Sequence, residues 1–169
     1  MPMKRYLSNI LIYVAALFGV IAFIGLFACP LQHYDSIKDT WSNYNVKAYL
    51  GVVQSGVKVY KGTFVPIIGY VLPLLMSIFL IIESFKPSLS GKLTLINTLF
   101  AVLYFISAIL VLLTKELWLN ANNFGTTNEI RNGSGPIMAS ILSCLAGIIL
   151  LIVTYMPGRK EIDFIDRNN

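Results

Sequence analysis

The sequence predicts an all-α integral membrane protein, built as a four-helix transmembrane bundle. Of its 169 residues, 56% are hydrophobic and only 12% are charged, whereas soluble domains average about 45–50% apolar and about 25% charged residues. The apolar residues form four uncharged blocks, each near the roughly 20 residues that a helix needs to cross the hydrocarbon core. We therefore expect one membrane domain with both termini in the cytoplasm and a small β-hairpin outside.

These blocks define the expected spans and loops. Glu83, Lys115 and Glu116 lie at the block margins, where long side chains reach the headgroups. The expected spans cover residues 8–29, 64–83, 93–114 and 136–156. They are joined by outer loops 30–63 and 115–135 and by inner loop 84–92, and they are followed by a cytoplasmic tail, 157–169.

The distribution of basic residues gives the expected orientation, because Lys and Arg favour cytoplasmic segments. With the N terminus inside, seven of the 13 basic residues lie in the short inner segments and six in the longer outer loops. Lys4 and Arg5 flank the first span, which usually dominates the orientation. These cations are explained by topology and by anionic headgroups, so we expect the lipid bilayer and no nucleic acid as a partner.

The alternative for the first span is a cleaved lipoprotein signal. Residues 26–29 partly resemble a bacterial lipobox, in which a small residue precedes a lipidated cysteine, here Cys29. Phe27 fits this motif poorly, and the apolar stretch exceeds the roughly 7–15 residues of a signal peptide. We therefore expect a retained helix.

The two halves of the first outer loop differ in their hydrophobic pattern. Residues 30–45 are polar and aromatic without a clear period, whereas hydrophobic and polar residues alternate over 46–53 and again over 57–60. Gln54-Ser55-Gly56 supplies a turn between these stretches, which predicts the hairpin. The second outer loop is rich in Asn, Gly and Thr, so we expect turns with little regular structure, and Trp118 in the interfacial aromatic belt.

Small residues recur at every fourth position in the fourth span, which lets another helix backbone approach closely. The first span offers a shorter matching surface, so we expect the first and fourth spans to dock. The spacing alone leaves open whether a second subunit uses the same stripe. The expected interface comprises Gly135, Ala139, Ser143, Gly147, Ala15 and Gly19.

Pro73 lies inside the second span, where it removes a backbone hydrogen bond and predicts a kink. Such breaks line the substrate site in some transporters. No ionisable residue lies at the same depth, which argues against proton-coupled or ion-coupled transport and favours a structural role. The candidate hinge or ligand site comprises Gly69, Pro73, Ser77 and Asn97.

The sequence offers little for catalysis or cofactor binding. His33 is the only histidine, and with Asp35 and Asp39 beside it makes a thin basis for general-base catalysis or metal binding. The motif C-x-x-C is absent, so thiol–disulfide exchange lacks its reactive pair. We therefore expect no enzymatic activity, no cofactor and no metal.

In topology the chain resembles the claudin-like four-span proteins, which have both ends inside and a larger first outer loop containing β-structure. The likeness covers the span order and one tryptophan of the first loop, Trp41. The chain lacks the Gly-Leu-Trp run and the paired loop cysteines of that family. The resemblance therefore implies an architecture and no junctional or adhesive function.

Two function classes are expected. The first is a non-enzymatic membrane protein that acts through contacts with another membrane protein or with itself, as an accessory subunit or a surface-facing module. The loop aromatics available to a partner are Trp41, Tyr44, Tyr49 and Tyr60. The alternative is a small transporter or channel for an apolar or lipid-like ligand at the kinked second span. A structured outer cap favours the first class, and a cavity at the candidate ligand site favours the second.

Overall fold

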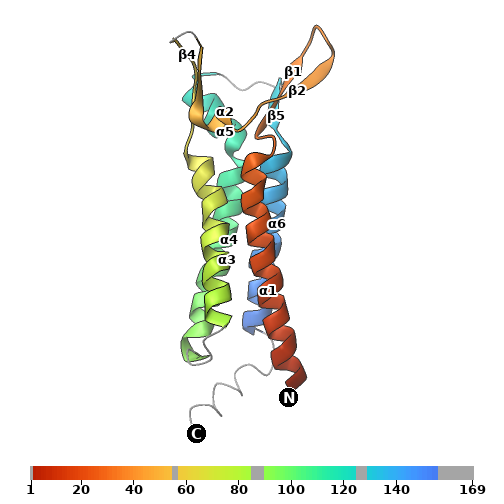
Figure 1. Ribbon diagram of the computed structural model, residues 1–169, viewed down its shortest axis with the longest axis vertical. Helices are drawn as coiled ribbons and strands as arrows, with labels where there is room; N and C mark the ends of the chain where they lie inside the picture. Colours follow the sequence, from red (N-terminus) through yellow and green to blue (C-terminus); the bar gives the residue numbers. More distant parts are fainter. Residues whose placement is uncertain (1, 55–56, 85–89, 125–128, 156–169) are drawn as a thin grey trace.

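The computed structural model describes residues 2–54, 57–84, 90–124 and 129–155 (Figure 1). Four long helices form an elongated bundle, and each is long and apolar enough to cross a membrane, as the sequence predicted. The helices are α1 (Pro2–Ile24), α3 (Val65–Ser84), α4 (Ser90–Leu112) and α6 (Ser134–Tyr155).

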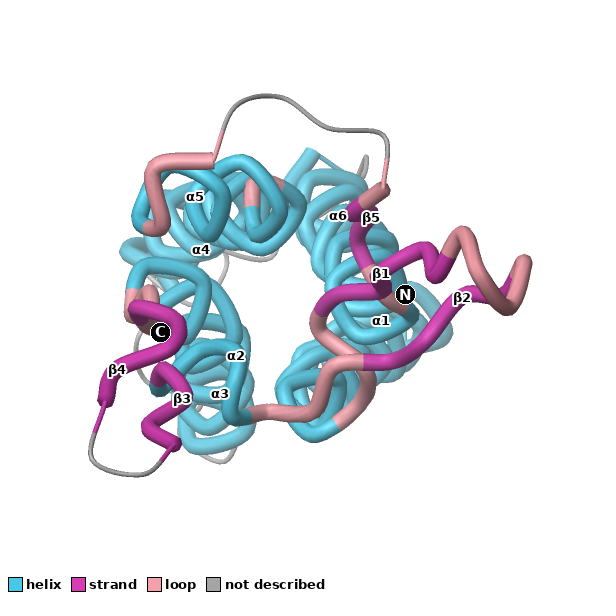
Figure 2. Tube along the Cα trace, turned by 90° about the horizontal axis from the view of Figure 1, so that it is seen from above, coloured by secondary structure: helices cyan, strands magenta, loops and turns pink. Residues whose placement is uncertain are grey.

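The four helices run alternately up and down, and each packs against two others. Helices α3 and α6 both pack against α1, and both also pack against α4, which completes a ring (Figure 2). Because four alternating helices return the chain to the end where it began, Pro2 and Tyr155 lie at the same end of the bundle (Figure 1). The strands and the short helices lie at the opposite end.

Each long helix buries one face and exposes the other. On α3, Tyr70, Pro73 and Leu80 lie at the three- and four-residue spacings of a single helix face, and all are buried. Ile68 and Leu75 lie on the outward face and are exposed. An apolar outward face of this kind suits lipid tails and is costly in water.

The remaining elements form a unit that we call the cap, which contains residues 28–64 and 113–133 as far as they are described. Its three-stranded antiparallel sheet has the order β2-β1-β5, and its second sheet pairs β3 with β4. The chain enters the cap through a single turn, η1 (Gly25–Phe27). The cap elements are β1 (Leu31–Asp35), β2 (Thr40–Asn43), α2 (Lys47–Leu50), β3 (Gly51–Gln54), β4 (Val57–Lys61), α5 (Thr114–Ala121) and β5 (Ile130–Asn132).

The strand expected from residue 46 is wrong over its first half, because 47–50 form the helical turn α2. Ala48 and Tyr49 are both buried, and two consecutive residues of a strand would face opposite sides. The Asn45 side chain accepts a hydrogen bond from the Lys47 backbone N–H at 2.9 Å and so starts the turn. Gly51, at a φ of 88°, ends it, and β3 follows.

The expectation of little regular structure in the second outer loop is also wrong. It contains helix α5 and strand β5, which pairs with β1 of the first loop. Residues 30–45, which show no period in the sequence, contain β1 and β2. Trp118 is almost fully buried inside the cap, so it does not belong to an interfacial belt.

Candidate functional site

The interior around Pro73 is closed by hydrogen bonds between helices. Pro73 has no N–H, which leaves the Gly69 carbonyl without its helical donor. Ser107 of α4 donates its hydroxyl to that carbonyl at 2.5 Å. Ser77 donates to the Pro73 carbonyl at 2.7 Å, and its hydroxyl lies 3.0 Å from that of Tyr104. These contacts satisfy backbone groups that lipid cannot satisfy.

Two glycines let the helices approach closely on either side of Pro73. A Cβ at Gly19 would collide with the Ser77 hydroxyl and would lie 2.8 Å from the Pro73 carbonyl oxygen. A Cβ at Gly69 would lie 2.7 Å from Val111 Cγ2. Side chains and backbone therefore fill the space beside Gly69, Pro73 and Ser77. Gly19, which we expected to face the fourth span, faces α3 and α4.

Asn97 lies apart from the other three residues of the candidate ligand site. It is on α4, seven residues before Tyr104, and so lies about 10 Å closer to the Tyr155 end of the bundle. Its side chain is fully buried, and within the described residues neither its Oδ1 nor its Nδ2 has a hydrogen-bond partner. The structure therefore places Gly69, Pro73 and Ser77 along one buried face of α3, over about 12 Å, and Asn97 beyond them on α4.

The small-residue stripe of α6 contacts two helices of the same chain. At its first residues, Gly135 donates its backbone N–H to the Cys29 carbonyl at 3.0 Å, and a Cβ there would lie 2.5 Å from the Gly25 carbonyl oxygen. Further along, a Cβ at Gly147 would lie 3.1 Å from the Phe105 ring of α4. The stripe thus begins against the α1–η1 segment and ends against α4.

The other members of the expected interface are buried in the bundle. Ser143 lies with its hydroxyl 3.5 Å from that of Ser107 on α4. Ala139 belongs to a buried cluster with Ala22 of α1, and Ala15 belongs to a second cluster with Ala146 of α6. All of these contacts are within one chain.

An aromatic cluster forms the centre of the cap. The Trp118 ring lies 5.4 Å from that of Tyr60, 5.8 Å from that of Tyr44 and 5.9 Å from that of Phe124, measured between ring centres. Burial, and then the neighbouring Tyr60, raise the pKa of Tyr44. Tyr44 and Tyr60, which we expected to face a partner, are half-buried and pack against Trp118.

Tyr49 connects the cap to the bundle. It comes from α2, which lies over the end of the bundle beside α3 (Figure 2). Its hydroxyl is 3.0 Å from that of Tyr70 on α3, and both side chains are fully buried. Burial raises the pKa of Tyr49. Because it is enclosed, Tyr49 is not available to a partner either.

Two asparagines fasten cap segments: Asn122 joins the two loops, and Asn132 joins β5 to the junction of α4 and α5. Asn122 accepts a hydrogen bond from the Lys61 backbone N–H at 2.7 Å and donates to the Lys61 carbonyl at 3.1 Å. Asn132 accepts from the Lys115 backbone N–H at 3.0 Å and donates to the Leu112 carbonyl at 2.7 Å. The sequence showed only that this loop is rich in asparagine, and composition alone does not identify the backbone groups to which each asparagine bonds.

The β1–β2 hairpin forms part of the outer surface of the cap. Trp41 lies on it, half-buried, with the Arg131 guanidinium 3.9 Å from its ring centre. Tyr34 donates a hydrogen bond to the Asp39 carboxylate, which raises the pKa of Tyr34. Ile37, at the hairpin turn, has 94% of its surface exposed. Of the four aromatics expected to face a partner, Trp41 alone lies on this surface.

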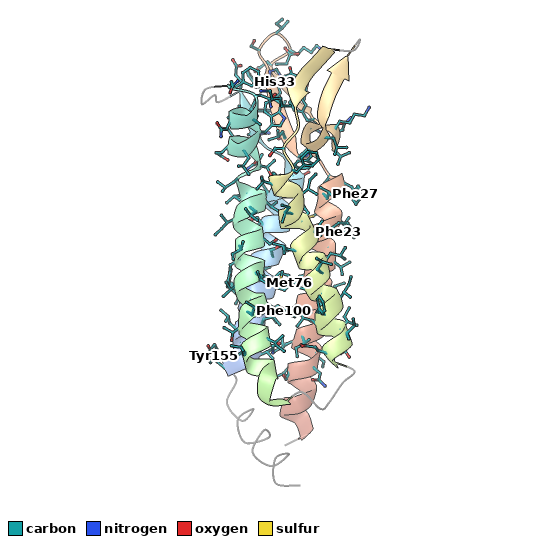
Figure 3. The ribbon with its side chains drawn as sticks, turned by 90° about the vertical axis from the view of Figure 1, so that its left-hand side faces the viewer. Phe23, Phe27, His33, Met76, Phe100 and Tyr155 are labelled. Atoms are coloured by element: carbon teal, nitrogen blue, oxygen red, sulfur yellow. The ribbon has the colours of Figure 1, made fainter. Side chains whose placement is uncertain are left out.

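His33 lies in the cap, far from the bundle centre (Figure 3). It is on β1, and its ring centre is 6.5 Å from that of Tyr44. Among the residues that the structure describes, no group of three His, Cys, Asp or Glu side chains is placed to hold a metal ion. The cap is thus a packed structural unit from which the β1–β2 hairpin projects (Figure 1).

Comparison of the chain with protein-family models, with curated proteins and with solved structures gave no match.

Proposed function

We propose that this protein is a non-enzymatic multi-pass membrane protein that acts through protein contacts made by its cap. The main support is that both long loops fold into one packed unit while the β1–β2 hairpin stays exposed. In the described chain β2 is an edge of its sheet, and edge strands carry unpaired backbone groups that a partner strand can bind. Ile37 and Trp41 add apolar area beside this edge.

We further propose that both termini are cytoplasmic and that the cap faces outward. The basic residues support this orientation, above all Lys4 and Arg5 beside the first span. The packing of α1 supports its retention in the mature protein, because Ala15 and Ala22 are fully buried against other helices. In this arrangement the cap meets partners outside the cell or in the outer parts of neighbouring membrane proteins.

The alternative function, a transporter or channel with its site at Pro73, has less support. A ligand there would have to displace contacts that already join the helices, including the Ser107 hydroxyl bonded to Gly69. A small ligand would need those side chains to move apart. Binding of an apolar probe that Gly69→Leu abolishes would favour this alternative.

The contact proposal is tested by purifying the full chain from its own membranes in mild detergent and measuring its mass and companions. We expect a second copy or one membrane protein at a fixed ratio. The double variant Ile37→Asp/Trp41→Ala should lose this companion, while Ser42→Ala, an exposed position on the same strand, should keep it. A monomer without companions, in the detergent extract and after cross-linking in the membrane, would refute the proposal.

A further inference from the structure

Near the Tyr155 end of the bundle, two neighbouring helices carry buried polar atoms that have no hydrogen-bond partner among the described residues. Asn97 of α4 is fully buried, and neither end of its amide has a hydrogen-bond partner within the described residues. Glu83 of α3 is half-buried, and its Oε2 is buried and also without a partner there. A buried amide or carboxylate oxygen without a partner is costly, so such groups usually hold a water or a ligand.

The register between α3 and α4 places these two side chains at the same depth. Gly69 bonds to Ser107, and the rings of Phe79 and Phe100 lie 6.3 Å apart about two to three helical turns closer to the Tyr155 end. Glu83 follows Phe79 by about one helical turn, and Asn97 precedes Phe100 by about one turn. Because the helices are antiparallel (Figure 1), both steps lead in the same direction.

Both side chains also belong to the inward-facing rows of their helices. Asn97 precedes Ala101 and Tyr104 at helical spacing, and both of these are fully buried. Glu83 follows Leu80, which is almost fully buried, by three residues. The two polar groups therefore approach the same part of the interior from adjacent helices.

The other walls of this region are apolar. Leu150 and Val153 of α6 are fully buried, and Ile12 of α1 is almost so. Two hydroxyls near this end of the bundle have partners: Tyr13 accepts a hydrogen bond from Ser84 at 3.0 Å, and Thr154 donates to the Leu150 carbonyl at 2.7 Å. The stretches 65–84, 95–112 and 134–155 contain no Lys or Arg, so no cation within these stretches compensates the Glu83 charge.

We propose that Glu83 and Asn97 form a binding site for a small monovalent cation. The Glu83 carboxylate supplies one negative charge and the Asn97 Oδ1 a second oxygen, which is a hard-oxygen donor set. A single carboxylate matches a single positive charge, whereas divalent ions are generally held by more anionic ligands. Water retained by the ion accepts the hydrogen bonds of Asn97 Nδ2. The exposed part of Glu83 gives the ion a route from the aqueous side.

The test is the unfolding of the full chain in detergent in NaCl, KCl and choline chloride at equal ionic strength, together with equilibrium binding of radioactive Na⁺. Choline, a bulky quaternary ammonium ion that oxygen ligands coordinate poorly, serves as the reference cation. For wild type we expect saturable stabilisation by Na⁺ or K⁺. At a cation concentration ten times Kd, the folded-to-unfolded ratio should rise about 11-fold over choline.

Two variants and one control decide the assignment. Glu83→Gln and Asn97→Leu should both lose the cation dependence, and Asn97→Leu should be more stable than wild type in choline because it removes an unpartnered amide. Thr154→Val, which removes a buried hydroxyl bonded within its own helix, should keep the dependence. Equal unfolding of wild type in all three salts with no bound Na⁺, or equal stabilisation of every variant, would overturn the proposal.

Discussion

At the scale of single residues, buried polar side chains determine how the bundle closes. Pro73 leaves the Gly69 carbonyl without a helical donor, and Ser107 of another helix supplies the missing hydrogen bond. The backbone hydrogen bond that α3 lacks at Pro73 is therefore replaced by a side chain of α4. In the membrane such hydrogen bonds contribute about 0.6 kcal/mol on average and up to about 1.7 kcal/mol.

This coupling gives a prediction for Ser107→Ala. In the wild-type background the substitution should lower the free energy of unfolding by about 0.6–1.7 kcal/mol. In a Pro73→Ala background it should cost less, because the restored N–H at position 73 can bond the Gly69 carbonyl. Denaturant unfolding of the four proteins of the double-mutant cycle measures the difference. Equal costs in both backgrounds would show that Ser107 does not compensate the proline.

A second prediction concerns Asn122, which bonds both backbone groups of Lys61. Asn122→Ala removes both bonds and should loosen β4 from α5, at a cost of about 1–3 kcal/mol of local stability. Hydrogen exchange of the Lys61 amide should then become faster. Asn120→Ala, an exposed change on the same helix, is the control and should leave that exchange unchanged.

At the scale of elements, the sequence predicts the helices and strands that are marked by a continuous local pattern of residues. The four spans were found because uncharged apolar runs of that length have few alternatives. The cap was largely missed because its sheet pairs residues about a hundred positions apart, such as Leu31 with Asn132. No local period reveals such a pair. The helical turn α2 was missed for a related reason, since the burial of Tyr49 depends on Tyr70 in another element.

The cap elements should lose stability in alkaline solution. Burial raises the pKa of Tyr44 and of Tyr49, above the value of about 10 that tyrosine has when unfolded. Below pH 10 both states keep the protons, so stability is constant. Above it the unfolded chain loses protons first, and unfolding becomes more favourable as pH rises through the folded-state pKa.

Fluorescence measures this effect if Trp41→Phe leaves Trp118 as the single tryptophan, since the chain has two. The Trp118 emission should move to longer wavelength as the cap opens above pH 10. In a Tyr44→Phe variant of the same protein the change should be smaller. An emission that stays constant to pH 12 would contradict a role of these tyrosines in the alkaline opening.

At the scale of the whole molecule, the candidate site was predicted only in part. The sequence singled out Gly69, Pro73 and Ser77, which do lie on one buried face of α3, because glycine and proline inside a span are conspicuous. Ser107 and Tyr104, whose hydroxyls approach that face from α4, were not singled out, since a hydroxyl in an apolar span does not indicate which backbone group it bonds. Of the aromatics expected to face a partner, Tyr49 is fully buried, while Tyr44 and Tyr60 are half-buried in the aromatic cluster, because aromatic residues in loops also build packed cores.

The central claim is that the bundle spans the bilayer with the cap outside. Cysteine accessibility in intact cells tests it most directly, in a background with Cys29→Ala and Cys144→Ala. Asn43→Cys and Asn120→Cys lie on exposed cap positions in the first and second loops. Both should react with a membrane-impermeant maleimide in intact cells, as a cysteine at position 125, outside the described residues, also should. Labelling of these cysteines only after the membrane is permeabilised would contradict the account.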